Sequence, residues 1–158
     1  DFKGRIVKLI GITKHNIYDV LRLKLKDDQI GFVSSNAFSI AESSVNPDYQ
    51  TRAAIVDGKI VGFAMYTEWV NALWMKEQKQ KPGEYYIPRV MVDKSYQGNG
   101  YGRQLMVLLL NEIEKNRPKA IHIVYCPDNK VAKELYLSLG FEEYGKNSDG
   151  DTLARLTS

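Results

Sequence analysis

Apolar residues recur along four segments of the chain at the spacing typical of amphipathic helices. The strongest apolar stripe, at helical spacing, includes Leu105, Leu109 and Ile113. Apolar residues at the same helical spacing also follow Asn129. Gly140 suits the position just after a helix, and Pro47 disfavours helical backbone in the residue before it. One predicted helix follows an N-cap at Thr13. Three more cover residues 35–45, 103–116 and 129–139.

Between these helices lie runs rich in β-branched and aromatic residues. Asp57-Gly58 predicts a tight hairpin, because a type I′ turn needs two positive φ angles. Pro88 lacks an N–H group, so a bulge or an end of regular pairing is expected close to it. The predicted strands cover residues 5–12, 51–56, 59–66, 85–92, 120–126, 141–144 and 152–156, with a mixed stretch at 67–83. This order predicts an α/β (α+β) fold, a mixed sheet in one domain over residues 1–158.

Composition excludes several classes of protein. The 158 residues include 1 Cys and 2 His, which excludes an internal disulfide and a cysteine-based zinc cage, so no metal is expected. A net charge of +3 without a basic block predicts neither nucleic-acid binding nor a membrane partner, and no apolar run is long enough to span a bilayer. No secretory signal is seen after Asp1, so we expect a cytoplasmic protein. The chain does not begin with Met, which leaves open whether its N-terminus is complete.

A glycine-rich segment, residues 97–102, joins a predicted strand to the long predicted helix. Gly98, Gly100 and Gly102 lack Cβ atoms, so successive backbone N–H groups can turn toward one anion beside the positive end of the helix. A pyrophosphate is the expected guest. The P-loop needs Gly-Lys-Ser/Thr, and the dinucleotide fingerprint needs G-x-G-x-x-G; the segment matches neither motif. A tight turn without a ligand remains the alternative.

The same segment resembles the Q/R-x-x-G-x-G/A signature of the GNAT superfamily of acetyl-CoA-dependent N-acetyltransferases. Residues 129–141 are similar to that family's N-x-x-A-x-x-x-Y-x-x-x-G-F segment, and the order of elements agrees over essentially the whole chain. The resemblance implies the GNAT fold, a mixed and mostly antiparallel central sheet flanked by helices. Within the superfamily, residues 59–66 and 92–98 are most similar to bacterial spermine/spermidine (polyamine) acetyltransferases.

The resemblance also implies where acetyl-CoA binds. The pantetheine arm would pair with the main chain of Val90, Met91 and Val92, where a backbone N–H near Met91 is the candidate oxyanion donor. Asn129 would hydrogen-bond the same arm. Arg103 would reach a phosphate, although a solvated helix residue is an equally good interpretation. The pyrophosphate would be held by backbone N–H groups of Gln97, Gly98, Asn99, Gly100, Tyr101 and Gly102.

Catalysis in this family needs a proton donor for the thiolate and a base for the amine. Tyr136 matches the family's general acid; its ordinary pKa of about 10 keeps it protonated, and packing on a helix face is the alternative. Polyamine acetyltransferases usually carry an acidic residue where this chain has Pro88. Glu84 is therefore the candidate base, with a solvated strand-end charge as the alternative. His122 is expected to be a packed or surface strand residue, and Cys126 a buried structural one.

The amine acceptor would be drawn by negative charge and aromatic faces. Glu42 and Glu68 could attract a cation, or could face solvent. Aromatic residues offer cation–π faces to an ammonium, and core packing explains each of them equally well. They are Trp69, Trp74, Tyr85 and Tyr86.

These observations favour an enzyme that transfers acetyl directly from acetyl-CoA to a primary amine. A polyamine such as spermidine or spermine, or another small cationic amine, is the first expectation. The alternatives are a protein N-terminus, a lysine or an antibiotic amine, and, in a different class, a non-catalytic acyl-CoA-binding sensor. A homodimer is possible, and nothing in the sequence decides it.

Overall fold

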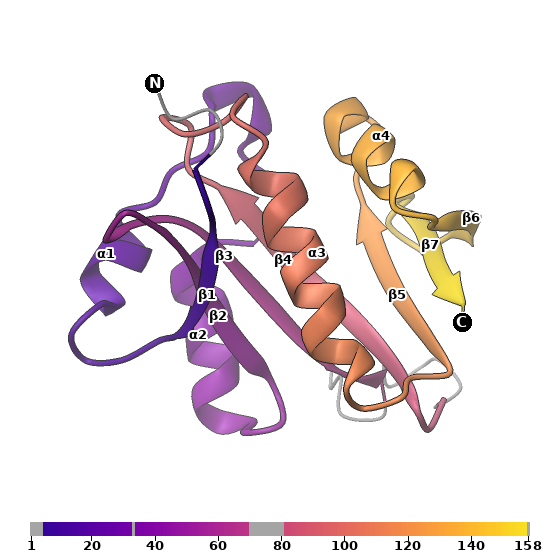
Figure 1. The fold of residues 1–158 in the computed structure, drawn as a ribbon. Helices are drawn as coiled ribbons and strands as arrows, with labels where there is room; N and C mark the ends of the chain where they lie inside the picture. The colour runs from indigo at the N-terminus through magenta and orange to yellow at the C-terminus, as the bar shows by residue number, and fades with distance from the viewer. Residues whose placement is uncertain (1–4, 33, 70–80, 158) are drawn as a thin grey trace.

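A mixed sheet of seven strands forms the centre of the computed structural model, which describes residues 5–32, 34–69 and 81–157 (Figure 1). The strands are β1 (Lys8–Gly11), β2 (Gln50–Val56), β3 (Lys59–Glu68), β4 (Glu84–Val92), β5 (Ala120–Tyr125), β6 (Glu142–Lys146) and β7 (Thr152–Thr157). They lie in the order β1-β2-β3-β4-β5-β7-β6. Among the strands of these described residues, only β4 and β5 pair in parallel. The expected mixed, mostly antiparallel sheet is confirmed.

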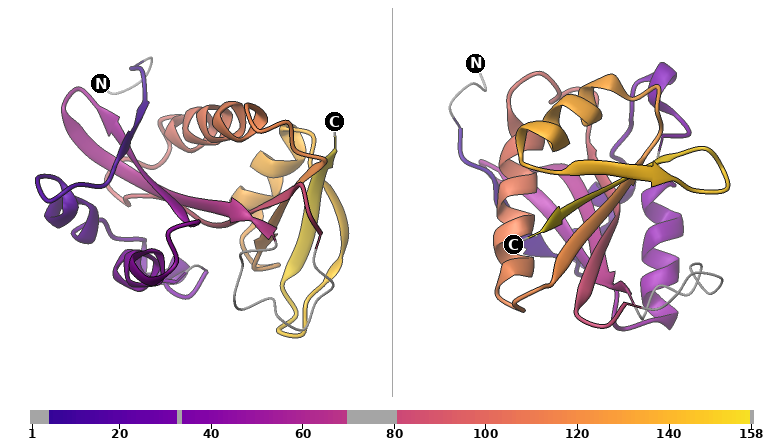
Figure 2. Two further views of the ribbon diagram at one scale, coloured as in Figure 1. Left: turned by 90° about the horizontal axis from the view of Figure 1, so that it is seen from below. Right: turned by 90° about the vertical axis from the view of Figure 1, so that its right-hand side faces the viewer.

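Helices cover both faces of this sheet (Figure 2). They are α1 (Ile17–Leu21), the 3-10 turn η1 (Asp27–Gln29), α2 (Asn36–Val45), α3 (Tyr101–Glu114) and α4 (Lys130–Ser138). One core cluster joins residues of α3 and α4 to one face, and a second joins α1 and α2 to the other. All four expected helices are present. The turn η1 was not predicted, because a single turn has no periodicity to detect.

The apolar stripe of α3 anchors it to the sheet. Leu105, Leu109 and Ile113 have side chains that are completely buried. Burying one such side chain contributes about 1.5–3 kcal/mol, so the stripe fixes α3 firmly across the strands. The start of α3 is thereby held beside the ends of β4 and β5, where the chain's glycine-rich segment lies.

Two local sequence signals produced the expected backbone. Asp57 and Gly58 have φ angles of 49° and 78°, as the predicted hairpin turn requires. Near Pro88 the register between β3 and β4 shifts between Met65 and Thr67. On the other side of β4, pairing with β5 stops at Ile87. Both expected consequences of Pro88 are therefore confirmed.

Other boundaries differ from the expectations. The first strand is shorter than residues 5–12, β3 continues to Glu68, and α3 begins at Tyr101 rather than at 103. Trp74 and most of the mixed stretch 67–83 lie outside the described residues. Within the described ranges, no helix is long and apolar enough to cross a bilayer.

Gly62 in β3 leaves space for the main chain of β4. A Cβ added there would lie 2.7 Å from the carbonyl oxygen of Met91 and 3.1 Å from Leu105 Cδ1. The close approach lets α3 pack down on the two strands. Because β4 carries the candidate cofactor-binding main chain, Gly62 also affects the site.

We expect Gly62→Ala to lower the free energy of unfolding by about 1–3 kcal/mol, because the new methyl group must push the Met91 carbonyl or α3 away. Urea unfolding measures this change. Gly145→Ala is the matched control, since nothing lies within 4 Å of a Cβ at that strand position. An equal effect of the two substitutions would show that the close approach at Gly62 carries no energetic weight.

Candidate active site

The two parallel strands β4 and β5 separate toward their C-terminal ends (Figure 1). Their parallel pairing joins Glu84–Ile87 to Ala120–Ile123 and then ends. A pocket of about 480 Å³ lies at the diverging ends of the strands. It is lined from η1, the end of β4, the glycine-rich loop, the start of α3, and α4. The pocket residues that the sequence singled out are Val90, Met91, Val92, Gln97, Gly98, Gly100, Tyr101, Gly102, Arg103, Asn129 and Tyr136.

The glycine-rich loop has the backbone that an anion cradle needs. Gly98 and Gly100 both adopt φ of 81°, a conformation that other residues rarely take. Gly100 is the N-cap of α3 and supplies no side-chain acceptor to the first-turn N–H groups. Those N–H groups and the helix dipole point toward the loop and favour a bound phosphate.

Two amide side chains brace this loop from within. Gln97 Nε2 donates to the carbonyl oxygen of Val92 at 3.0 Å, and Asn99 Nδ2 donates to that of Tyr96 at 3.0 Å. Gln97 also exchanges two hydrogen bonds with Gln29 of η1, at 2.9 and 3.1 Å. These side chains therefore shape the cradle, which leaves ligand contact to the backbone.

The cations near the pocket come from two elements. Arg103 lines it, and its Nη1 donates to Ser138 Oγ at 2.8 Å. Lys26, beside η1, also lines the pocket and was missed by the sequence analysis. No sequence signal marked Lys26 or Gln29, because both reach the pocket from an unpredicted turn.

Asn129 serves α4 and the pocket together. Its Oδ1 accepts from the N–H of Ala132 at 3.2 Å and so caps the helix. The side-chain amide carries its two N–H donors on the other atom, Nδ2. Asn129 is therefore held in place by its oxygen while its nitrogen can serve a ligand.

Tyr136 lines the same pocket from the last turn of α4. Its ring packs against those of Tyr125 and Phe141, with centroids 5.4 and 6.0 Å away. Burial raises the pKa of Tyr136 above its ordinary value of 10. The phenol therefore stays protonated at neutral pH, as a proton donor must.

Glu84 lies away from this pocket, at the opposite end of β4. At about 3.3 Å per residue, Glu84 and Val90 are about 20 Å apart along the strand. Glu84 Oε1 is 2.9 Å from His122 Nε2, and His122 is buried rather than on the surface. Glu84 is therefore too far away to contact an amine at the end of β4 directly.

The three candidate acceptor-binding residues have partners of their own. Glu42 Oε1 receives a hydrogen bond from Arg89 Nη2 at 3.0 Å, and Phe38 packs beside the same guanidinium. Glu68 Oε1 accepts from the N–H of Gly83 at 3.0 Å. The ring of Tyr85 lies 6.5 Å from that of Tyr66, on the face covered by α3. Glu68 and Tyr85 are cross-strand partners in β3 and β4, and burial together with the charge of Glu68 raises the pKa of Tyr85. Glu42 comes from α2 and is paired with Arg89 instead.

Two other side chains that the sequence analysis singled out, Trp69 and Cys126, lie away from the pocket. Trp69 is buried and meets His122 edge-on, with ring centroids 4.5 Å apart. Cys126 is half-buried and follows the end of β5. Neither lines the pocket between the strands.

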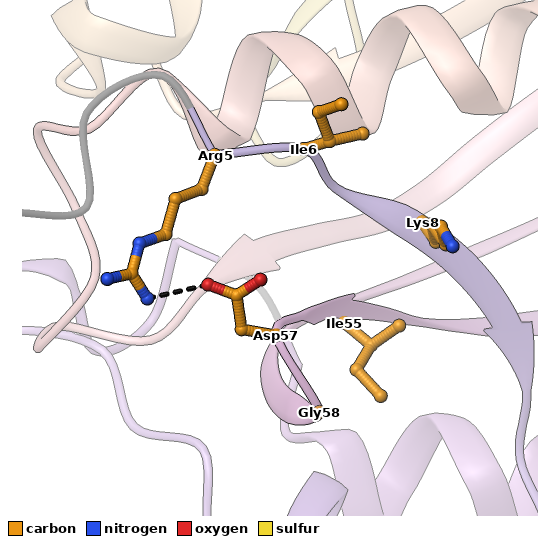
Figure 3. Close-up of a pocket in the computed structure, with 6 residues that line it drawn as sticks. All are labelled: Arg5, Ile6, Lys8, Ile55, Asp57 and Gly58. Atoms are coloured by element: carbon orange, nitrogen blue, oxygen red, sulfur yellow. Dashed lines mark hydrogen bonds and ion pairs between the residues drawn. The ribbon is translucent and has the colours of Figure 1, made fainter.

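A second hollow lies at the other end of the sheet, beside β1 (Figure 3). It has a volume of about 580 Å³ and is lined by Arg5, Ile6, Lys8, Ile55, Asp57 and Gly58. Arg5 Nη1 and Asp57 Oδ2 form an ion pair at 2.6 Å, so the two charges offset each other. The hollow shares no residue with the pocket between β4 and β5.

Curated relatives cover most of the chain. A probable spermine N(1)-acetyltransferase of Bacillus subtilis subsp. natto (strain BEST195) is 25% identical over 141 residues, which is 89% of this chain and 90% of the relative. A spermine/spermidine N(1)-acetyltransferase of Bacillus subtilis (strain 168) is 24% identical over the same shares of the two chains.

Solved structures share the fold. An aminoglycoside acetyltransferase, AAC(6')-Ib, in complex with coenzyme A and kanamycin has a TM-score of 0.75 at 20% identity, covering 96% of this chain and 94% of that one. The ribosomal-protein-S18-alanine N-acetyltransferase from Escherichia coli has a TM-score of 0.70 at 20% identity, with the same coverage. The model of the acetyltransferase (GNAT) family matches residues 17–141. This chain, with its glycine-rich cradle at the parting of two parallel strands, belongs to the GNAT family of acetyltransferases.

Proposed function

We propose that this chain transfers the acetyl group of acetyl-CoA directly to a primary amine. One observation carries the proposal: a single pocket joins the cradle at Gly98–Gly100, the end of β4, Asn129 and Tyr136. These are the groups needed to hold a pyrophosphate, extend a pantetheine arm and reprotonate a thiolate.

The end of β4 suits the pantetheine arm. Beyond Ile87, β4 has no β5 partner in the part of the chain that the structure describes. Main-chain groups on that edge can pair with the amides of pantetheine as with an added strand. In this arrangement the backbone N–H near Met91 is our candidate donor to the oxyanion, because a fixed amide dipole needs no reorganisation.

Tyr136 acts at the second half of the transfer. When the tetrahedral intermediate collapses, the C–S bond breaks and the thiolate takes the phenolic proton of Tyr136. Burial raises the pKa of the Tyr136 hydroxyl, so the donor stays neutral until the thiolate forms. Cys126 plays no part, since the acetyl group passes without a covalent enzyme intermediate.

Polyamines are the first acceptor class that we propose. The relatives named for spermine and spermidine support it, because their similarity extends over 89% of the chain. Glu68 and the aromatic face of Tyr85 would favour a cationic amine. The site of the family's usual acid is Pro88, so negative charge must come from elsewhere.

A peptide N-terminus is the second candidate. Arg89 offsets the charge of Glu42, with side chains only 14% and 21% exposed, which lowers the attraction for a polycation. An α-amino group has a pKa of about 7.7–8.0 and needs a weaker base than a polyamine does. The Glu42–Arg89 pair is the observation that favours this acceptor.

Two substitutions of Asn129 distinguish its proposed contact with the cofactor from its role as the N-cap of α4. Asn129→Asp keeps the capping oxygen and removes the N–H donor, whereas Asn129→Ala removes both. We expect Asn129→Ala to lose about 1 kcal/mol of stability and Asn129→Asp to lose little of it. Both substitutions should weaken CoA binding in calorimetry. Unchanged CoA affinity in Asn129→Asp would contradict the proposed contact.

Thiol release from acetyl-CoA with a panel of amines tests the function itself. The panel contains spermidine, spermine, diamines, aminoglycosides and short peptides. We expect turnover with polyamines first, and Tyr136→Phe to reduce kcat by about 100-fold or more while CoA binding is kept. Preference for peptides would select the second candidate. CoA binding with no turnover on any amine, and no effect of Tyr136→Phe, would identify a sensor instead of an enzyme.

A further inference from the structure

A buried chain of hydrogen bonds crosses three strands outside the cofactor pocket. His122 on β5 is 1% exposed, and both of its ring nitrogens have partners. Nε2 lies 2.9 Å from Glu84 Oε1 on β4, and Nδ1 lies 2.8 Å from Tyr144 Oη on β6. The arrangement of carboxylate, imidazole and hydroxyl is that of a general-base relay.

The partners fix which nitrogen carries the proton. An ionised carboxylate only accepts, so Nε2 of His122 donates to Glu84. Nδ1 then has a free lone pair and accepts from the hydroxyl of Tyr144. Burial lowers the pKa of His122 below its ordinary value, although the hydrogen bond and the charge of Glu84 oppose the change. The imidazole is therefore neutral and oriented to receive a proton at Nδ1.

The strand register places this chain beside the cleft. His122 pairs with Tyr86, one position before β4 and β5 part. Tyr144 directly follows the β6 residue that pairs with Ala154, and Ala154 pairs with Ile123, the last β5 residue that β4 contacts. Burial raises the pKa of Tyr86, and Tyr144 and Asp151 add smaller contributions in the same direction. The backbone of Tyr144 thus lies level with the last paired residues of β4 and β5, its hydroxyl reaches His122, and Glu84 lies two residues before Tyr86 on β4.

We propose that Tyr144, His122 and Glu84 form the proton-accepting relay for the attacking amine, with Tyr144 as the residue that meets the acceptor directly or through one water. The inference rests on the proposed function and deepens it. Tyr144 is the catalytic residue of the relay, and His122 and Glu84 position and support it. Glu84 acts through His122, which reconciles its distance from Val90 with a role in removing the amine proton.

The proton balance is complete. The bound ammonium first passes one proton to Tyr144 Oη, while the proton of Tyr144 moves through His122 to water. The neutral amine then attacks the thioester carbonyl, so a C–N bond forms and the carbonyl π electrons become the oxyanion. The nitrogen, now cationic, passes a proton to Tyr144 Oη while the proton of Tyr144 moves to His122 Nδ1. Collapse re-forms the carbonyl and breaks the C–S bond, and Tyr136 protonates the thiolate. His122 then gives this proton to water, and Tyr136 takes one proton back from water, so that one proton in total is released per ammonium substrate.

The surroundings of His122 make an imidazolium short-lived, and burial is the largest reason. Glu84 stabilises it, whereas Lys81 and Arg155 disfavour it. Lys81 Nζ lies over the ring of Trp69 at 4.9 Å, and the Arg155 guanidinium lies over the ring of Tyr144 at 4.9 Å. Glu84 has a side chain that is 21% exposed and offers the way out to water. His122 therefore loses each proton that it receives and returns to its neutral form.

Stability against pH tests the buried neutral imidazole. Because the pKa of His122 is lower in the folded chain than its unfolded value of about 6.5, the neutral form contributes stability that is complete above about pH 6.5 and is lost as pH falls below it. Urea unfolding should show a larger loss for wild type than for His122→Gln between pH 7.5 and 5.0. The exposed His15 gives the control His15→Gln, which should follow wild type. Equal losses in all three would contradict a buried neutral His122.

Kinetics test the relay, with the most rapidly acetylated amine of the panel as acceptor. We expect Tyr144→Phe to lower kcat at pH 7 by about 100-fold, with the KM for acetyl-CoA unchanged and the defect shrinking as rising pH deprotonates the amine. His122→Gln should act alike, and the double variant should be no worse than either single one. Tyr66→Phe, which removes a tyrosine–glutamate hydrogen bond to Glu112, is the matched control and should keep full activity.

Three results would overturn the relay: an unchanged kcat in Tyr144→Phe, a loss of the same size at every pH, or additive losses in the double variant. If wild type transfers acetyl and Tyr144→Phe transfers it equally well, this inference alone is overturned. Failure of wild type to acetylate any amine overturns the proposed function together with it.

Discussion

The early end of hydrogen bonding between β4 and β5 is the constraint on which the site depends. Parallel strands normally continue side by side, yet here the ladder stops at Ile87 and Ile123. Pro88 contributes, because it cannot donate to a ladder and it lies at the register shift against β3. Main-chain groups beyond this point need other partners. A cofactor with amides along its arm can provide them, which is why we propose the break in the sheet as the binding site.

The rest of the molecule holds this break open. Buried residues of α3 fix the glycine-rich cradle beside β4, and Gly62 lets the strands and α3 approach closely. Gln97 ties the glycine-rich loop both to Val92 of β4 and to Gln29 of η1. Hydrogen bonds of Gln97 with η1 and with the end of β4 thus brace the β4 side of the divergence.

Local signals predicted what depends on neighbouring residues in the sequence. The hairpin at Asp57-Gly58, the bulge near Pro88 and the cradle followed by α3 all follow from backbone preferences, and all were found. The Glu84–His122–Tyr144 chain could not be predicted, because its members come from three strands joined only by the register. The Glu42–Arg89 and Gln29–Gln97 contacts have the same origin. Such pairings leave no periodic pattern in the sequence.

Mapping CoA onto the backbone amides by NMR tests the central claim most directly. If the parting of β4 and β5 is the cofactor site, adding CoA will shift the amide signals of residues 90–92 and 97–102. Signals of Lys8, Asp57 and Gly58, beside the second hollow, will stay in place and serve as an internal control. Shifts confined to the second hollow, or none at all, would contradict the account.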